Sequence, residues 1–243
     1  MSLIFEERQS DSPYVELITT GRTTGSSTTI RPAEIHWHLV IAKFEGGLMP
    51  IITGPLTSSG IVNFTEGVDL LWIRFKLGTF IPRLPVRGLL NTELTLPEAG
   101  GKSFWLDSTA WQLPSYENAD TFVNRLVRDD VLEFDPIVHV ALRNERLNIP
   151  DRTMRHRFQR ATGLTHVHIR QHERAQYAAS LLRQGRSILD TVFDAGYFDQ
   201  PHMTRALKHF VGYTPAQLAS EYNRSCEDAA ASATAHLKLQ TTA

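Results

Sequence analysis

The stretch from Ser187 to Leu218 reads SILDTVFDAGYFDQPHMTRALKHFVGYTPAQL and carries the start and stop signals of two consecutive helices. Ser187 can cap the first helix, and Gly196 can end it because glycine enters the left-handed conformation without a Cβ penalty. Asp199 can cap the second helix, whose first turn accommodates Pro201. The sequence therefore predicts a helix, a tight turn and a second helix, which is the arrangement of a helix-turn-helix unit.

Helical spacing assigns a core face and a polar face to each of these helices. The apolar stripe expected to face the core in the first helix is Ile188, Leu189, Val192 and Phe193. The corresponding stripe in the second helix is Met203, Ala206, Leu207 and Phe210. The polar residues of the second helix are Gln200, His202, Thr204, Arg205, Lys208 and His209. Such a face suits the DNA major groove, because arginine pairs bidentately with guanine and glutamine with adenine.

The segment from Pro136 to Gly163 repeats this pattern more faintly. A leading helix is predicted from Pro136 to about Arg146, a turn over Leu147–Asp151, and a following helix from Asp151 to Ala161 that Gly163 closes. Met154 and Phe158 face inward in that second helix. Its outward residues are Arg152, Arg155, His156, Gln159 and Arg160. A linking helix is predicted from about His168 to Gln184, with a buried face of Ile169, Ala175, Ala178, Leu181 and Leu182.

Three motifs resemble the DNA-binding region of the AraC/XylS family of transcription regulators. They are RHRFQRATG, the R-x-x-x-A-x-x-LL run from Arg174 to Leu182, and GYFDQPHMTRALKHFVGYTP. The resemblance covers about ninety residues and implies that the helices from Asp151 and Asp199 enter successive major grooves on one face of the DNA. It nominates as DNA-binding Arg152, Arg155, His156, Gln200, His202, Thr204 and Arg205. The outward faces of the two helices add Gln159, Arg160 and Lys208 as DNA-binding candidates. The chain departs from the family pattern at His156, Thr191 and Val192, which affects the expected base preference but not the fold.

Charge is distributed unevenly along the 243 residues, although the formal net charge is only −1. Residues 151–224 contain 11 Lys and Arg against 6 Asp and Glu, whereas residues 1–150 contain 13 against 18. This asymmetry indicates nucleic-acid binding at the C-terminal end alone, with Arg160, Arg170, Arg174 and Lys208 as candidate phosphate contacts.

Short strands separated by Gly and Pro breaks are predicted in the N-terminal half, which favours an antiparallel sheet or a small barrel. The predicted strands are Tyr14 to Thr20, Ile35 to Phe44, Met49 to Thr53, Ile61 to Phe64 and Asp69 to Lys76. Residues 1–12 are expected to be loosely held, and Gly21 to Thr29 to form a loop. The proline-rich residues 82–98 are expected to be irregular, with a short helix near Ser108 to Leu113. A helix between Tyr116 and Leu132 is expected to bridge the two domains.

This half also resembles the cupin-like sensor domain of AraC-type regulators, through the HWHLVI strand, Gly54-Pro55 and the IRFKLGTF segment. The resemblance implies a domain that binds an effector, dimerises, or both. Trp72 and Arg74 share a strand face, and Trp37 is a candidate third member; an aromatic ring beside Arg could bind a carboxylated or planar effector, although core packing is the simpler explanation.

Metal binding and catalysis have little support in the sequence. His36 and His38 share a strand face, as metal-binding cupins require, but no third ligand follows them in the N-terminal half, and we expect no metal or cofactor. Cys226 is the single cysteine and excludes a disulfide framework. No nucleophile elbow or phosphate-binding loop is present, so we expect no catalytic residues and no enzyme. No apolar run reaches the ~18 residues of a membrane helix, and the N-terminus lacks a signal sequence, which indicates a cytoplasmic protein without membrane contacts.

The sequence thus predicts an α+β protein with three regions: a β-rich sensor or dimerisation domain at residues 1–128, a double helix-turn-helix domain at 129–224 and a flexible tail at 225–243. The expected partners are double-stranded DNA, a small-molecule effector, a second copy in a homodimer, and RNA polymerase if the protein is an activator. Two alternatives stay open. One is a cupin-type metal or small-molecule enzyme with a helical docking module; the other is a regulator without an effector.

Overall fold

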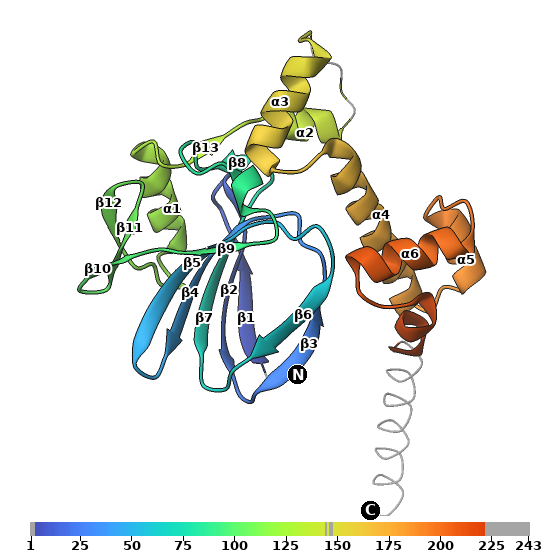
Figure 1. Cartoon of the computed structure of the whole chain (residues 1–243), viewed down its shortest axis with the longest axis horizontal. Helices are drawn as coiled ribbons and strands as arrows, with labels where there is room; N and C mark the ends of the chain where they lie inside the picture. The colour runs from blue at the N-terminus through green and yellow to red at the C-terminus, as the bar shows by residue number, and fades with distance from the viewer. Residues whose placement is uncertain (1–2, 144, 146–147, 222–243) are drawn as a thin grey trace, which may run out of the picture. The chain divides into compact units, whose positions relative to one another are not determined.

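The computed structural model describes residues 3–143, 145 and 148–221, and it divides into two compact units (Figure 1). Unit 1 comprises Met1–Ile30, Glu34–Thr57 and Ile61–Ile169. Unit 2 comprises Arg31–Ala33, Ser58–Gly60 and Arg170–Ala243. The predicted tail at 225–243 and the start of the predicted turn at Leu147 lie outside the described residues. The predicted fold class is confirmed, because the N-terminal half is β-rich and the C-terminal half is helical.

Unit 1 is built on a six-stranded antiparallel sheet in the order β1-β2-β7-β4-β5-β9 (Figure 1). Its strands are β1 (Leu3–Gln9), β2 (Val15–Thr23), β4 (His38–Phe44), β5 (Gly47–Thr53), β7 (Asp69–Phe75) and β9 (Glu93–Thr95). Three smaller sheets accompany it: the pair β3 (Ser27–Arg31) and β6 (Gly60–Phe64), the pair β8 (Thr79–Phe80) and β13 (Glu133–Phe134), and the trio β10 (Glu98–Gly100), β11 (Ser103–Leu106) and β12 (Thr109–Gln112).

Strand register gives the large sheet one apolar and one mixed face. Ile18, Ile73, Leu39 and Ile52 pair across four strands and are almost completely buried. The neighbouring row on the opposite face is Leu17, Arg74, His38 and Thr53, because side chains alternate along a strand. The apolar face belongs to a core that includes Phe122 of α1 (Ala119–Arg128) and Trp111 of β12. The mixed face is therefore the one that can present polar groups to a ligand.

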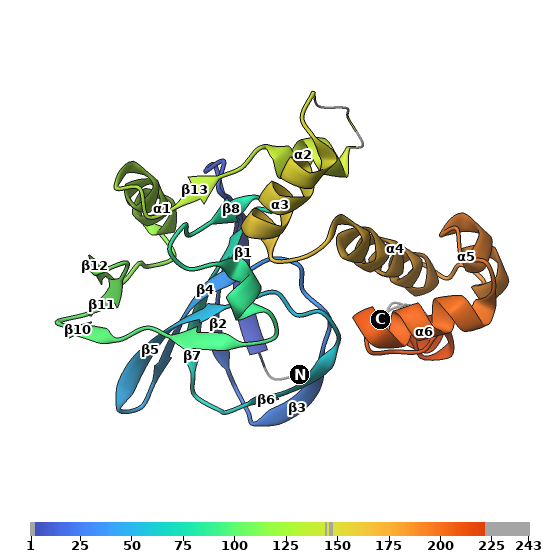
Figure 2. The same ribbon diagram turned by 45° about the horizontal axis from the view of Figure 1, so that its top comes forward.

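Helices α2 (Ile137–Leu142) and α3 (Asp151–Thr162) also belong to unit 1, where they pack against each other (Figure 2). Helix α3 contacts β8 and the 3-10 helix η1 (Val86–Leu89), and Phe158 and Ala161 are buried in the same core as the sheet. Gly163 ends α3 with a φ of +74°, and a Cβ there would lie 3.1 Å from backbone and side-chain atoms of Val86. Glycine is thus required at this position both by conformation and by close approach.

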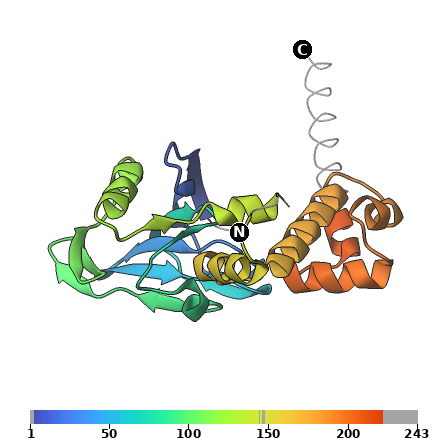
Figure 3. The same cartoon turned by 90° about the horizontal axis from the view of Figure 1, so that it is seen from above.

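Unit 2 contains most of α4 (His166–Arg183), all of α5 (Ile188–Asp194) and α6 (Gln200–Phe210), and a final helical segment at 215–221 (Figure 3). Its core is formed by alanines and Leu182 of α4 together with the apolar stripe of α6. The members of that stripe that are most deeply buried are Met203, Leu207 and Phe210. The small alanine side chains let the helices approach each other closely.

Three predictions for the N-terminal half are wrong. Leu3–Gln9 form β1, which pairs along its length with β2, because backbone pairing at a sheet edge needs no apolar side chains. The predicted loop Gly21 to Thr29 contains the end of β2 and the start of β3. The predicted helix near Ser108 is strand β12; Asp107 and Ser108 both have positive φ, as a two-residue hairpin turn requires.

The buried face of α5 also differs from the prediction. Leu189 and Phe193 are 67% and 78% exposed, while Thr191 and Val192 are buried. The Thr191 hydroxyl donates to the Ser187 carbonyl oxygen at 2.8 Å, so this polar side chain can face inward without an unmet hydrogen bond. The two compact units meet in the sequence between Ile169 and Arg170, whereas the predicted boundary between the functional domains lies at residues 128/129. That functional boundary stays a prediction.

Candidate nucleic-acid interface and effector site

Helix α6 is capped as its sequence predicts. The Asp199 carboxylate accepts the His202 backbone N–H at 2.7 Å, and Pro201 occupies the first turn. The preceding helix α5 is capped by Ser187, whose hydroxyl oxygen accepts the Asp190 N–H at 3.1 Å. Gly196 follows α5 with a φ of +66°. These local signals fix where α6 begins, and so which side chains it can present at its N-terminal end.

The outward side of α6 carries the predicted base-reading residues. Gln200, Arg205 and Lys208 are exposed, and their side chains make no ion pair or hydrogen bond with any residue the structure describes. His202 and Thr204 are half-buried: the His202 ring packs edge-on against Tyr197 at 5.2 Å, and the Thr204 hydroxyl donates to the Gln200 carbonyl oxygen. Three of the five nominated side chains are therefore free to meet a ligand.

The outward side of α3 is exposed too, but part of its charge is already paired. Arg160 lies 4.0 Å from Glu133, and its guanidinium stands 5.0 Å from the Phe80 ring centroid. The Arg155 Nε donates to the Asp151 carbonyl oxygen at 3.4 Å. The remaining nominated residues of α3 are exposed and have no such partner within the described ranges: Arg152, His156 and Gln159.

Arg157 of α3 was not nominated from the sequence. Its guanidinium forms a bidentate pair with Asp135, at 2.6 and 2.8 Å, and this hydrogen bonding raises the pKa of Arg157. Two of the residues that the sequence predicts to contact phosphate also have partners: Arg174 stands 4.5 Å from the Tyr197 ring centroid, and Arg170 lies 3.4 Å from Glu173. These two arginines therefore already have structural contacts, in contrast to Lys208.

Phe198 is a residue that the sequence reasoning missed. It directly precedes the cap of α6 and is 92% exposed, the largest exposure among the large apolar side chains that the structure describes. An apolar side chain at the start of a recognition helix can contact a thymine methyl group. The available signal was its place one residue before Asp199, where the ring has no helical face to join.

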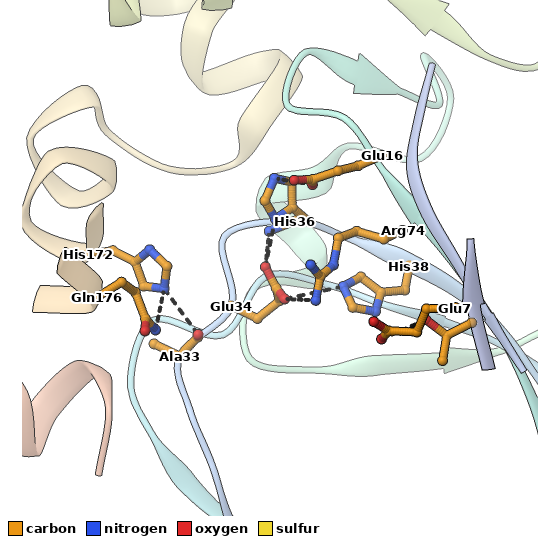
Figure 4. Close-up of polar contacts among 10 residues, drawn as sticks. Glu7, Glu16, Ala33, Glu34, His36, His38, Arg74, His172 and Gln176 are labelled. Atoms are coloured by element: carbon orange, nitrogen blue, oxygen red, sulfur yellow. Dashed lines mark hydrogen bonds and ion pairs between the residues drawn. The ribbon is translucent and has the colours of Figure 1, made fainter. Parts of the chain in front are cut away.

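The mixed face of the sheet in unit 1 carries a cluster of charged side chains centred on Glu34 (Figure 4). The His36 Nδ1 lies 2.7 Å from Glu34, and its Nε2 lies 2.9 Å from Glu16. Arg74 NH2 lies 3.1 Å from the second Glu34 oxygen, and the His38 Nε2 lies 3.6 Å from that same oxygen. We call these five residues the Glu34 cluster.

Electrostatics in the Glu34 cluster favour a charged His36 and a neutral His38. Burial alone would lower the pKa of His36, but the hydrogen bonds and charges of Glu16 and Glu34 raise it to about 9. Burial would raise the pKa of Glu34, yet the two histidines hold it far below its usual value. Burial lowers the pKa of His38, and Glu34 offsets this only in part. At neutral pH the cluster therefore contains two cations and two anions.

Two nitrogen atoms of this cluster are buried and have no hydrogen bond to any described residue: Arg74 Nε, and His38 Nε2, whose distance to Glu34 is longer than a hydrogen bond. Arg74 and His38 are register partners on adjacent strands, so the two nitrogens belong to one face. Trp72 shares this face, two residues from Arg74 on β7. Trp37 does not join them: it is buried, stacks on Phe75 at 3.9 Å and donates its indole N–H to the Thr79 carbonyl oxygen.

The described residues contain no group of three or more His, Cys, Asp and Glu side chains arranged to hold a metal ion. His36 and His38 instead contact carboxylates within the Glu34 cluster. In the same part of the chain, no helix combines the length and the apolar character needed to cross a membrane.

The arrangement of unit 2 is that of a DNA-reading class of protein, with a capped helix, a glycine turn and a second capped helix that exposes Arg and Gln. Residues 144–221 match the family described as a helix-turn-helix domain. This match agrees with the helix-turn-helix arrangement that the sequence predicts for the C-terminal part of the chain. Among solved structures, the chain is similar to ToxT from Vibrio cholerae, with 11% identity, 91% of this chain and 99% of that chain covered, and a TM-score of 0.34. None of the curated proteins matches the chain.

Proposed function

We propose that the protein is a sequence-specific transcription regulator in which α3 and α6 enter successive major grooves. The observation that carries the proposal is the free polar side of α6, where Gln200, Arg205 and Lys208 are exposed without intramolecular partners among the described residues. Arg205 reads a base edge, since a guanidinium pairs bidentately with guanine. Lys208 contacts phosphate and supplies affinity that depends on salt. A homodimer would read two such pairs of grooves.

Substitution of Arg205 tests this assignment. DNA fragments selected from the genome with the full-length protein provide the target sequences. Against a panel of single-base variants of such a target, Arg205→Ala should lose affinity by amounts that depend on the base at one or two positions. Arg186→Ala removes the same charge from unit 2, but Arg186 is paired with Asp194 at 2.8 Å, so it serves as the matched control. Equal loss on every variant would reduce Arg205 to a phosphate contact.

We also propose that an effector binds unit 1 at Arg74, His38 and Trp72. Support comes from Arg74 Nε and His38 Nε2, which make no hydrogen bond within the described residues, because buried donors normally have a hydrogen-bond partner and a ligand oxygen would supply one. The pair of donors on one face favours a carboxylate or a similar oxyanion, which Arg binds through its fork of N–H groups. Trp72 offers a flat apolar surface for the rest of the molecule.

A thermal-shift screen tests the effector proposal. Aromatic and aliphatic carboxylates should raise the unfolding midpoint measured by tryptophan fluorescence, whereas the matching primary amides should not. Arg74→Gln should abolish the shift. Arg22→Gln is the control, since Arg22 pairs with Asp69 on exposed parts of β2 and β7. If no compound in the screen shifts the midpoint, control by protein abundance or by a partner protein replaces effector control.

The cupin-type enzyme is the less favoured alternative, because the helical part matches a DNA-binding domain rather than a docking module. Metal analysis of the purified protein separates the two. Stoichiometric metal that is lost on His36→Ala would favour the enzyme, and protein that binds its DNA target without metal would favour the regulator.

A further inference from the structure

The carbonyl groups in the last turn of α6 have unusual partners. A helix leaves its last four carbonyl oxygens without intrahelical donors, so other groups must satisfy them. The Leu207 carbonyl oxygen accepts the N–H groups of Val211 and Gly212 at 2.8 and 2.9 Å. The next three carbonyl oxygens, of Lys208, His209 and Phe210, accept hydrogen bonds from a distant part of the chain.

Residues from the N-terminal half of the sequence supply the donors. The Ser59 hydroxyl donates to the Lys208 carbonyl oxygen at 2.9 Å, and the Ser59 N–H donates to the His209 carbonyl oxygen at 2.7 Å. The Ala33 N–H donates to the Phe210 carbonyl oxygen at 2.7 Å. Both donor segments, Arg31–Ala33 and Ser58–Gly60, belong to unit 2 although they lie more than a hundred residues before α6 in the sequence.

Ala33 is itself held in place by α4. The His172 Nε2 lies 3.1 Å from the Ala33 carbonyl oxygen, and it must be the donor because a carbonyl oxygen can only accept (Figure 4). Ala33 is buried in the core formed by α4 and α6, and the His172 ring packs edge-on against Phe210. Ala33 is therefore fixed on one side by a helix of the DNA-binding domain while its N–H caps another.

We propose that Ser59 and Ala33 are positioning residues for DNA recognition: they cap the C-terminal end of α6 and hold Lys208 and His209 in the orientation that meets DNA. Neither residue lies in the matched domain at residues 144–221, yet the two together donate to three carbonyl oxygens at the end of its helix α6. The proposal rests on the proposed DNA binding by α6.

Ser59→Ala in the full-length protein tests the proposal, because it removes one cap bond and keeps the backbone N–H. We expect faster amide exchange in the last turn of α6 and a loss of DNA affinity of roughly two- to tenfold, the range of one hydrogen bond. The loss should be equal on all target sequences and should come with a weaker salt dependence, because Lys208 is a phosphate contact. Ser59→Thr keeps the hydroxyl and should restore both properties, and Ser58→Ala in the same segment should change neither.

Two readouts separate this proposal from the proposed function. Unchanged exchange and unchanged affinity in Ser59→Ala would overturn the positioning role even if the wild-type protein binds DNA. If no variant binds DNA, the proposed function fails, and faster exchange in α6 would still report the cap. A fall in the unfolding midpoint of the whole protein with a normal salt dependence would also contradict the proposal, since that result indicates a merely structural contact.

Discussion

The two helices proposed to contact DNA, α3 and α6, are held in place by different means. Helix α6 begins at the Asp199 cap and ends at carbonyl oxygens that accept hydrogen bonds from Ser59 and Ala33. Helix α3 follows Pro150 and has no side-chain cap; it is fixed instead by burial of Phe158 in the core of unit 1 and by the ion pair between Arg157 and Asp135. Both helices bury apolar side chains in the core of their unit, but α6 also has hydrogen bonds from distant residues at its end, whereas α3 has an ion pair beside it.

This difference suggests a division of labour. Arg205 of α6 has no side-chain partner among the described residues, whereas Arg155 and Arg160 of α3 have partners and Arg152 does not. We therefore expect α6 to contribute more of the base discrimination and α3 to contribute affinity that depends on the stability of unit 1.

Alkaline pH should destabilise the unit that carries α3 and leave the unit that carries α6 unaffected. The pKa of His36 is about 9 in the folded state against an ordinary value of 6.5, so its stabilising charge is fully present below pH 6.5 and is lost as the pH rises through 9. Between pH 7 and 10 the free energy of unfolding of unit 1 should fall by roughly 2–3 kcal/mol, at about 1.4 kcal/mol for each pKa unit.

Urea unfolding measures this effect, because Trp37, Trp72, Trp105 and Trp111 all belong to unit 1 and their fluorescence reports on that unit. The charged and titratable groups that face His36 are Glu16, Glu34, His38 and Arg74, and the pKa values of the two glutamates are lowered well below this pH range. His36→Gln should therefore flatten the pH dependence. A variant that keeps the full dependence would assign it to another group.

Replacement of arginine by lysine should reduce DNA affinity more in α6 than in α3. Lysine keeps the charge but loses the bidentate fork that recognises guanine. Arg205→Lys should weaken binding to the preferred target by roughly tenfold while binding to random DNA stays the same, since one bidentate contact discriminates by ~1–3 kcal/mol. The matched change in α3 is Arg152→Lys, which should cost less; competition binding with both DNAs measures the two losses. Equal losses would remove the proposed division of labour.

Loss of the helix cap should destabilise unit 2 by about 1 kcal/mol, the usual effect of removing an N-cap side chain. Asp199→Ala removes the acceptor for the His202 N–H, and thermal unfolding followed by helical circular dichroism should record the change. Asp151→Ala removes an equal charge from the first turn of α3, where no cap bond exists, and should have a smaller effect. If Asp151→Ala is as destabilising as Asp199→Ala, the contrast between the helix ends is wrong.

Breaking the ion pair between Arg157 and Asp135 should have the smallest effect on DNA affinity. Asp135→Asn removes the paired charge but keeps an oxygen that can accept the Ile137 N–H. The freed guanidinium should increase affinity for random DNA about two- to threefold at low salt, an advantage that salt removes. Nitrocellulose filter binding over a salt series measures it. Lower affinity at low salt would contradict this prediction and would show that the ion pair between Asp135 and Arg157 positions α3 for DNA binding.

The sequence allowed accurate prediction where structure depends on neighbouring residues. Ser187, Gly196 and Asp199 act within four positions along the chain, so the ends of α5 and the start of α6 followed from residue type. Met203 and Leu207 were placed in the core because α6 is long enough for its apolar period to be unambiguous. Helix α5 has seven residues, and its period alone did not reveal that Phe193 faces outward.

Features that depend on distant partners could not be predicted. Strand β1 has no apolar pattern and forms through pairing with β2. The sequence did not reveal that strand register brings Arg74 beside His38, or that Glu34 contacts His36, His38 and Arg74. The cap that Ser59 provides for α6 joins positions 149 residues apart. In each of these cases the contact joins residues that only the folded chain brings together, so the local sequence does not identify the partner.

The central claim is that one chain reads two adjacent major grooves through α3 and α6. Methylation interference on a selected DNA target tests it most directly, since it maps guanines whose modification in the major groove blocks binding. The account predicts two groups of guanines on one face of the DNA, centred one helical turn or about 10 base pairs apart, and loss of just one group's effect in Arg205→Ala. A single group, or two groups on opposite faces, would contradict the account.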